Sequence, residues 1–219
     1  ARALDANDDL ARWRDEFLFP SPVEGRAVYL CGNSLGLQPK RTRRWVEREL
    51  DHWAEHAVEG HFRGDKPWFA YHEFFAAGTA RLVGAQPGEV VVMNGLTVNL
   101  HLMLVSFYRP TASRFRIVLE AGAFPSDRYA VASHARLHGF DPDLAIVELS
   151  PRPGEDLLRT DDVETFLADE GESVALVLMG GVNYYTGQAF DLPAITAAAH
   201  AVGARVGFEA GATHRYRTI

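Results

Sequence analysis

Cysteine is almost absent from this chain, which has a single one, Cys31, among its 219 residues. One cysteine excludes an internal disulfide framework and is typical of a reducing compartment. Its apolar surroundings are typical of a small buried residue, although a catalytic thiol fits the same pattern. Long apolar runs are also absent, since none approaches the roughly 18 residues of a membrane span. The chain does not open like a signal peptide, and we expect a cytoplasmic protein with no membrane partner.

Positive charge is scarce as well. Arg and Lys number 22 against 29 Asp and Glu, which gives a formal net charge of −7. Nucleic-acid binding requires clustered cations that neutralise phosphates, so the composition argues against a nucleic-acid partner. The one basic run, residues 40–44, is followed by acids on the same predicted helix and is interpreted as a solvated face. Lysine occurs only at Lys40 and Lys66, which bears on the chemistry below.

What the chain does contain is an alternation of apolar strands and helices. Residues 1–60 form an N-terminal arm, with helices predicted at 10–17 and 39–57 and a short strand at 27–30. Residues 61–219 form a larger domain. Its predicted strands are 89–93, 115–120, 144–149, 174–179 and 205–208, and its predicted helices are 69–83, 97–107, 126–137, 161–169 and 192–201. This pattern predicts an α/β fold with a mostly parallel sheet and flanking helices.

Ligands of such sheets bind at the carboxyl ends of the strands, and two segments there could hold a cofactor. In the first, Gly95 lets the backbone turn before Thr97, and the backbone N–H groups of the new helix could bind a phosphate. An ordinary N-cap threonine is the alternative. In the second, Phe124 could stack on a flat ring with Ser126 and Asp127 beside it. Ordinary packing of Phe124 below an N-cap Ser126 is the alternative.

Further strand ends carry weaker signals. The loop 180–187 has paired glycines and tyrosines. Glu209 follows the last predicted strand, where an acid could pair with a protonated ring nitrogen of a cofactor or could simply be solvated. Two histidine pairs have helical i, i+4 spacing, 52/56 and 134/138, but they lack a third ligand and the metalloprotease pattern. No metal is therefore predicted, and the turn 32–36 does not match the nucleophile elbow of hydrolases.

Taken together, the motifs resemble the kynureninase family. The resemblance covers residues 5–208 in order and spacing. The segments that carry it are Tyr29–Pro39, Gly60–His61, Lys66–Trp68, Met93–His101, Ala123–Asp127 and Tyr185–Gln188. The implied fold is part of the large domain of a pyridoxal-phosphate-dependent transferase of fold type I, preceded by an N-terminal helical arm.

The resemblance implies a pyridoxal 5'-phosphate enzyme of tryptophan catabolism and NAD biosynthesis. Such an enzyme hydrolyses L-kynurenine or 3-hydroxy-L-kynurenine to anthranilate or 3-hydroxyanthranilate plus L-alanine. The cofactor is the electron sink, and the protein orients it. The family also implies a homodimer. The choice between the two kynurenines is left open.

The resemblance also implies roles for individual residues. Leu96 and Thr97 would hold the cofactor phosphate, and Phe124 would stack on the cofactor ring. Pro125, Ser126 and Asp127 belong to the same cofactor-binding stretch. Ser34 and His61 would face the substrate, and the resemblance allows them to come from the partner subunit of a homodimer.

Several positions depart from the family pattern. Glu209 stands where an aspartate is expected, Gly180 stands where a phosphate-side serine is expected, and Ala212 stands where a histidine is expected. The similarity ends after Phe208. The lysine that binds the cofactor covalently in the family has no counterpart, so no catalytic residue is assigned.

The sequence therefore predicts the N-terminal half of a kynureninase, from a truncated or frameshifted gene. As written, the chain is expected to be poorly soluble and inactive. The alternative is a real, non-catalytic fragment that at most binds phosphate or the cofactor weakly. A relative of the cysteine desulfurases, which share the fold, is a third interpretation.

Overall fold

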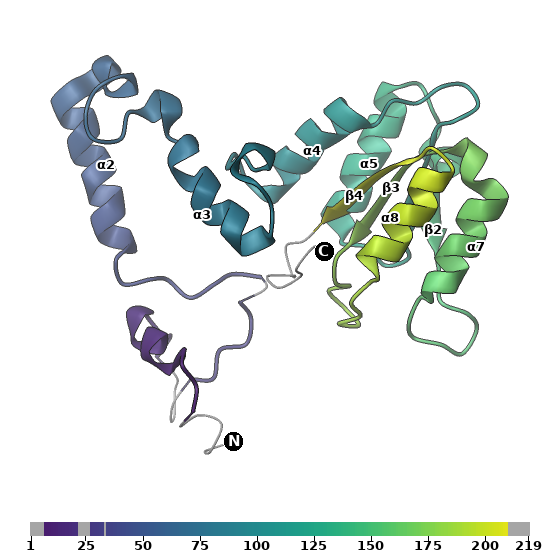
Figure 1. Ribbon diagram of the computed structural model, residues 1–219, viewed down its shortest axis with the longest axis horizontal. Coiled ribbons are helices and arrows are strands. Elements are labelled where there is room, and N and C mark those ends of the chain that lie inside the picture. The colour runs from purple at the N-terminus through teal and green to yellow at the C-terminus, as the bar shows by residue number, and fades with distance from the viewer. Residues whose placement is uncertain (1–6, 22–26, 33, 210–219) are drawn as a thin grey trace. The chain divides into compact units, whose positions relative to one another are not determined.

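The structure is a computed structural model that describes residues 7–21, 27–32 and 34–209 (Figure 1). The chain divides into two compact units, Ala1–Ala76 and Ala77–Ile219. The predicted domain boundary after residue 60 stays a prediction. None of the described helices is both long enough and apolar enough to cross a lipid bilayer.

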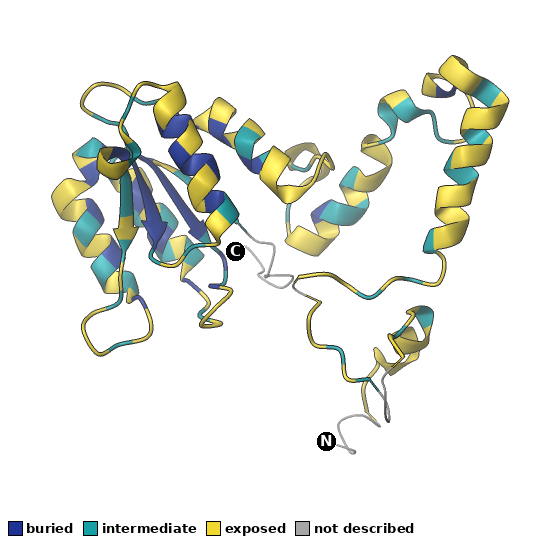
Figure 2. Ribbon diagram, turned by 180° about the vertical axis from the view of Figure 1, so that it is seen from behind, coloured by how far each residue is buried: buried dark blue, intermediate teal, exposed yellow. Residues whose placement is uncertain are grey.

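The first unit is built from short helices. The predicted helix 39–57 is present as an α-helix, whereas the one near 10–17 is a 3-10 helix. The elements are η1 (Ala11–Glu16), α2 (Thr42–His56), η2 (Ala57–His61) and η3 (Trp68–Ala70). Helix α3 (Glu73–Val83) begins in this unit and continues into the second, which starts at Ala77. Exposed residues predominate along α2 (Figure 2), including the apolar side chains of Val46, Leu50 and Trp53. This apolar stripe, spaced four and three residues apart, faces no core formed by the described residues.

The predicted strand at 27–30 is wrong. These residues have no strand partner among the described residues, and the side chains of Val28 and Leu30 are 81% and 84% exposed. An apolar run becomes a strand only when a neighbouring strand satisfies its backbone groups. The expectation that Cys31 is buried is wrong for the same reason, because the segment packs on no core and the thiol is exposed.

The second unit contains the predicted parallel sheet. Its strands are β1 (Arg116–Glu120), β2 (Ile146–Leu149), β3 (Val174–Gly180) and β4 (Arg205–Glu209). They are all parallel and lie in the order β2-β1-β3-β4. Helices connect them, as is usual for parallel strands, which need long crossover connections. The α/β fold class with a parallel sheet is confirmed.

Helices cover both faces of this sheet (Figure 1). The helices of the second unit are α4 (Leu96–Phe107), α5 (Pro125–Leu137), α6 (Pro142–Ala145), α7 (Thr160–Glu170) and α8 (Leu192–Ala201), with short 3-10 turns η4 (Pro87–Glu89) and η5 (Gly171–Ser173). One core lies between the sheet and α7 and α8, and it contains Val118. The other lies between the sheet and α4 and α5, and it contains Ile117 and Leu119. This alternation is the period of two expected of a strand buried on both faces.

A β-bulge interrupts the pairing of the two central strands. Arg116 pairs with Val174, but the next residue, Ile117, pairs with Leu176. Ala175 is therefore an extra residue on β3. As a result Ala175 and Leu176 both pack into the core under α4 and α5.

The predicted strand at 89–93 is wrong. Glu89 ends η4, and Val90 continues in an extended conformation with φ −123° and ψ 133°. Residues 90–93 nevertheless pair with no strand of the described sheet, and Val91 and Val92 are largely exposed. The β-branched residues favour an extended backbone, but a ladder also needs a partner.

The strand order creates a switch point between β1 and β3. From β1 the chain moves outward to β2, and then crosses back over β1 to β3 and on to β4. Connections from the two central strands therefore leave in opposite directions. In open α/β sheets the crevice at such a point, outside the carboxyl ends of the strands, is where ligands bind.

Candidate functional site at the switch point of the sheet

The crevice at the switch point is formed where the two central strands separate. The paired positions of β1 and β3 end at Val118 and Val177. On the outer sides the pairing runs further: the Ala121 N–H donates to the Leu149 carbonyl at 2.8 Å, and the Gly181 N–H donates to the Glu209 carbonyl at 2.7 Å. The sheet therefore opens only between β1 and β3. Residues lining the small hollow there are Leu100, Leu119, Glu120, Ala123, Asp127, Leu178, Met179, Gly180 and Glu209.

Glu120 bridges the gap between the separated strands. The backbone N–H of Gly180 donates to both carboxylate oxygens of Glu120, at 3.1 and 3.2 Å. A side chain at Gly180 would fit tightly, since its Cβ would lie 3.0 Å from Oε1 of Glu120 and 3.2 Å from the Val182 carbonyl oxygen. The serine expected from the family pattern would therefore press on this carboxylate.

Three carboxyl groups converge on the hollow, those of Glu120, Asp127 and Glu209. Glu120 and Asp127 are only 5% and 7% exposed. Burial raises the pKa of Glu120; the N–H groups of Glu120 and Gly180 oppose this rise, and the charges of Asp127 and Glu209 add to it. Burial also raises the pKa of Asp127, against a hydrogen bond from Ser126. Such an acidic pocket favours a ligand with a positive charge.

Phe124 lies next to this hollow, directly before α5. Pro125 is the first residue of the helix, where its missing N–H is harmless. The Phe124 ring is 50% exposed and meets the Tyr184 ring edge-to-face at 5.1 Å between centroids. Phe124 therefore does not pack below the helix, contrary to the alternative interpretation. An aromatic face with one side available is suited to stacking on a flat ring.

The loop after β3 holds Tyr184 in place. Its organiser is the buried Asn183, whose Oδ1 accepts hydrogen bonds from the N–H groups of Tyr185 and Thr186, both at 3.0 Å, and from the Thr186 hydroxyl at 3.2 Å. This is an Asx turn, in which a side chain replaces a backbone acceptor. Tyr184 is thereby presented to Phe124 from a fixed turn.

The first turn of α4 is the predicted phosphate site. Leu96 and Thr97 open the helix after Gly95, and no side chain caps the free N–H groups there. Thr97 is the second helical residue rather than the N-cap. The preceding turn is braced by Asn99, which accepts from the Asn94 N–H at 3.1 Å and donates to the Asn94 carbonyl at 3.0 Å. Uncapped N–H groups at a helix start are suited to an anion.

The two predicted substrate residues lie in the first unit. Ser34 is exposed, and its N–H donates to the Cys31 carbonyl at 3.0 Å. His61 is exposed at the end of η2, with its ring edge-on to Trp68 at 5.5 Å. Their role at the site of the second unit stays a prediction.

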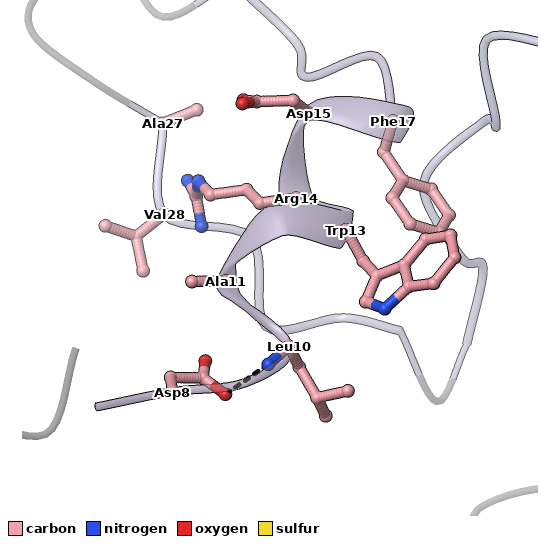
Figure 3. Close-up of a pocket in the computed structure, with 9 residues that line it drawn as sticks. All are labelled: Asp8, Leu10, Ala11, Trp13, Arg14, Asp15, Phe17, Ala27 and Val28. Atoms are coloured by element: carbon pink, nitrogen blue, oxygen red, sulfur yellow. Dashed lines mark hydrogen bonds between the residues drawn. The ribbon is translucent and has the colours of Figure 1, made fainter. Parts of the chain in front are cut away.

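A separate hollow in the first unit carries none of the predicted residues (Figure 3). It lies between η1 and the segment Ala27–Val28, and Arg14 extends from η1 toward that segment. Asp8 accepts a hydrogen bond from the Leu10 N–H at 2.9 Å beside it. No buried polar group converges there, so the hollow is not a candidate for the chemistry.

Neither histidine pair forms a metal site within the described residues, where no group of three or more His, Cys, Asp or Glu side chains is placed to hold a metal ion. His134 instead pairs across helices, with Nε2 3.0 Å from Nδ1 of His101. His134 is buried, and its Nδ1 has no hydrogen-bond partner among the described residues. Burial, followed by the nearby His101 and His138, lowers the pKa of His134.

Of the predicted residues, the structure brings Asp127 and Glu209 to the hollow, with Phe124, Pro125 and Ser126 on the same turn as Asp127. Sequence reasoning missed Glu120 and Tyr184. Glu120 is a single acid after three apolar strand residues, the same signal that drew attention to Glu209 at the end of β4. Tyr184 lay in a loop whose signal was weak, because nothing local marks its contact with Phe124.

The fold is similar to that of solved structures. One similar solved structure is C-DES with glycine covalently linked to its PLP cofactor; the TM-score is 0.64 at 14% identity, covering 83% of this chain and 46% of that one. The chain thus shares part of the fold of this structure. No protein-family model matches the chain.

Sequence comparison then specifies the relatives. The chain is 59% identical over 210 residues to a kynureninase of Myxococcus xanthus, covering 95% of this chain and 49% of that protein. It is 61% identical over 192 residues to a kynureninase of Salinispora tropica, covering 86% and 45%. The resemblance to kynureninases is confirmed, and the chain spans about half the length of the curated relatives it matches.

Proposed function

We propose that this chain is the part of a kynureninase that binds pyridoxal 5'-phosphate. The reaction is hydrolysis of L-kynurenine, or its 3-hydroxy form, to the corresponding anthranilate plus L-alanine. The observation that carries the proposal is the convergence of Asp127 and Glu209 at the switch point, beside the half-exposed Phe124. These residues lie in a sequence that is at least half identical to several kynureninases.

The residues present fit the cofactor. The uncapped first turn of α4, with Leu96 and Thr97, offers N–H donors to the phosphate. Phe124 offers an aromatic face to the pyridine ring, with Ser126 beside it. Asp127 and Glu209 supply negative charge where a protonated ring nitrogen would be stabilised.

When bound, the cofactor supplies an electron sink for cleavage of the bond to the aryl ketone carbon. The residues of this chain bind it and orient it. Phe124 would stack against the ring and help to orient it. Glu209 takes the place of the family's aspartate, with a side chain one methylene longer.

We propose that Ser34 and His61 contact the substrate and that the protein works as a homodimer in the cytoplasm. The single, exposed Cys31 supports a reducing compartment. Support for self-association comes from the apolar stripe of α2, which faces no core within the described residues. Exposed apolar patches of this kind mark association surfaces.

The lysines of these 219 residues, Lys40 and Lys66, both lie in the first unit, and neither follows a strand of the sheet. A polypeptide of these residues alone is therefore expected to bind the cofactor without a covalent bond and to produce no anthranilate. This is the non-catalytic alternative stated from the sequence.

The test is calorimetric titration of the chain with pyridoxal 5'-phosphate. We expect binding, and Phe124→Ala should weaken it roughly five- to tenfold, since one aromatic stack is worth about 1 kcal/mol. Tyr129→Ala is the matched control, because Tyr129 is an exposed aromatic on the same helix. Equal losses in the two variants, or no binding by the parent chain, would contradict the proposal.

A further inference from the structure

Glu120 occupies a place in the sheet that backbone groups usually fill. The pairing of β1 with β3 ends two residues before Glu120, while β1 stays paired with β2 and β3 stays paired with β4 up to the ends of the strands. The Gly180 N–H points into the opened gap, and the carboxylate of Glu120 receives it. A buried N–H without an acceptor destabilises a fold by about 1–3 kcal/mol, so this contact matters for the local geometry.

The two ends of this contact lead directly to the cofactor-binding residues. Four residues after Glu120 comes Phe124, followed by the buried Asp127 at the start of α5. Four residues after Gly180 comes Tyr184, whose ring meets that of Phe124. The separation of Glu120 and Gly180 therefore sets how the two loops face each other.

We propose that Glu120 is a positioning residue. Its carboxylate replaces the backbone hydrogen bond that is missing between the ends of β1 and β3, and it sets the width of the crevice that holds the cofactor. The effect on cofactor binding rests on the proposed function, but the hydrogen bonds between Gly180 and Glu120 do not. Glu120 need not touch the cofactor, because it acts through Gly180 and the two loops.

This role requires a side chain long enough to bring an acceptor oxygen to the Gly180 N–H, and it does not require a negative charge. Glutamine keeps the length of the side chain and one acceptor oxygen, so Glu120→Gln can still receive the Gly180 N–H. Aspartate keeps the charge but is one methylene shorter, so Glu120→Asp leaves the N–H unpaired, as Glu120→Ala does. A residue that acted only through its negative charge would show the opposite order.

The experiment combines two measurements on the 219-residue chain: hydrogen exchange of the Gly180 amide by NMR, and calorimetric titration with pyridoxal 5'-phosphate. We expect slow exchange in the parent chain and in Glu120→Gln. We expect at least about tenfold faster exchange in Glu120→Asp and Glu120→Ala, with cofactor affinity lowered by a similar factor. Glu148→Ala is the control, because Glu148 is an exposed carboxylate on the neighbouring strand β2.

The outcomes separate this inference from the proposed function. If exchange of the Gly180 amide depends on the length of the side chain at position 120 but the parent chain does not bind the cofactor, the role of the Glu120 hydrogen bond is supported and the proposed function fails. Glu120→Asp behaving like the parent chain in both measurements overturns the inference, as does Glu120→Gln behaving like Glu120→Ala. Faster exchange with unchanged cofactor affinity overturns the positioning role.

Discussion

At the scale of single residues, the second unit buries polar groups in two different ways. Glu120 is buried with a donor, the Gly180 N–H. His134 is buried with one ring nitrogen facing His101 and the other without a described partner. Adding a proton to His134 would give it a second N–H without an acceptor, so the charged form is disfavoured. Burial raises the pKa of Glu120 and lowers the pKa of His134. As the pH falls, the two groups therefore change the free energy of unfolding in opposite directions.

This difference predicts a pH dependence of stability at His134. Its folded pKa is lowered below the ordinary value of 6.5, so the unfolded chain takes up the proton first as the pH falls. Stability is then lost as the pH falls from 6.5 toward the lowered value. His134→Gln, which keeps a partner for His101, should lose less unfolding free energy than the parent chain between about pH 7 and pH 5.

Urea unfolding at a series of pH values checks this expectation. His200→Gln is the control, because His200 is exposed at the end of α8 and should follow the parent chain. If the free energy of unfolding changes with pH equally in His134→Gln and the parent chain, the buried histidine does not determine the loss of stability at low pH.

Residue-scale prediction from sequence worked where one local signal was enough. Phe124 and Asp127 follow a strand and lie at the start of a helix, and the structure places them at the edge that this order implies. Glu120 was missed because its partner, Gly180, is 60 residues away along the chain. Hydrogen bonds of that sequence separation depend on strand order, which local patterns do not contain.

At the scale of elements, α4 depends on the turn that precedes it. Asn99 reaches back one turn and makes two hydrogen bonds with Asn94. These bonds hold the chain so that the N–H groups of Leu96 and Thr97 are free at the helix start. A side chain from within the helix thus braces the residue before the N-cap Gly95 and leaves the N–H groups of the first turn uncapped.

We predict that Asn99→Ala weakens binding of pyridoxal 5'-phosphate by roughly fivefold, because the loss of two hydrogen bonds loosens the phosphate-binding turn. Calorimetric titration with pyridoxal, which has no phosphate, is the comparison, and its affinity should change little. Asn99→Asp keeps the acceptor for the Asn94 N–H, and its affinity for pyridoxal 5'-phosphate should lie between those of the parent chain and Asn99→Ala. An equal loss with both ligands would place the effect outside the phosphate turn.

Elements with a partner were predicted well, and those without one were not. The helix 192–201 has the predicted bounds, and β1, β3 and β4 differ by one residue at an end. The predicted strands 27–30 and 89–93 have the same apolar, β-branched composition as real strands. Both fail because no described strand pairs with them, and pairing is a property of the tertiary fold.

At the scale of the whole molecule, the two units differ in how they bury apolar surface. The second unit has two cores, one on each face of its sheet. The first unit has no such cluster among its described residues, and Trp45 and Trp53 on α2 are 45% and 63% exposed. A helix with an apolar stripe gains its stability mainly from what that stripe packs on.

We therefore predict that Leu50→Glu and Trp53→Glu each shift the chain from dimer to monomer, because a charge on the apolar stripe would have to be desolvated on association. Light scattering coupled to size-exclusion chromatography measures the change in mass. Glu55→Lys, at an exposed polar position of the same helix, should leave the mass unchanged. A chain that is monomeric before any substitution would contradict the proposed homodimer.

The bulge at Ala175 has a consequence for how this sheet tolerates changes of length. Ala175 and Leu176 share the side of α4 and α5, and beyond them Val177 and Met179 face α7 and α8 while Leu178 faces α4 and α5. Deleting Ala175 would remove the bulge and leave the facing of the remaining residues unchanged, whereas deleting a residue after the bulge would exchange the two faces of the rest of β3. Insertions and deletions after the bulge in β3 should therefore be far less tolerated than loss of Ala175, and diverging relatives should change length at the bulge or in their loops instead.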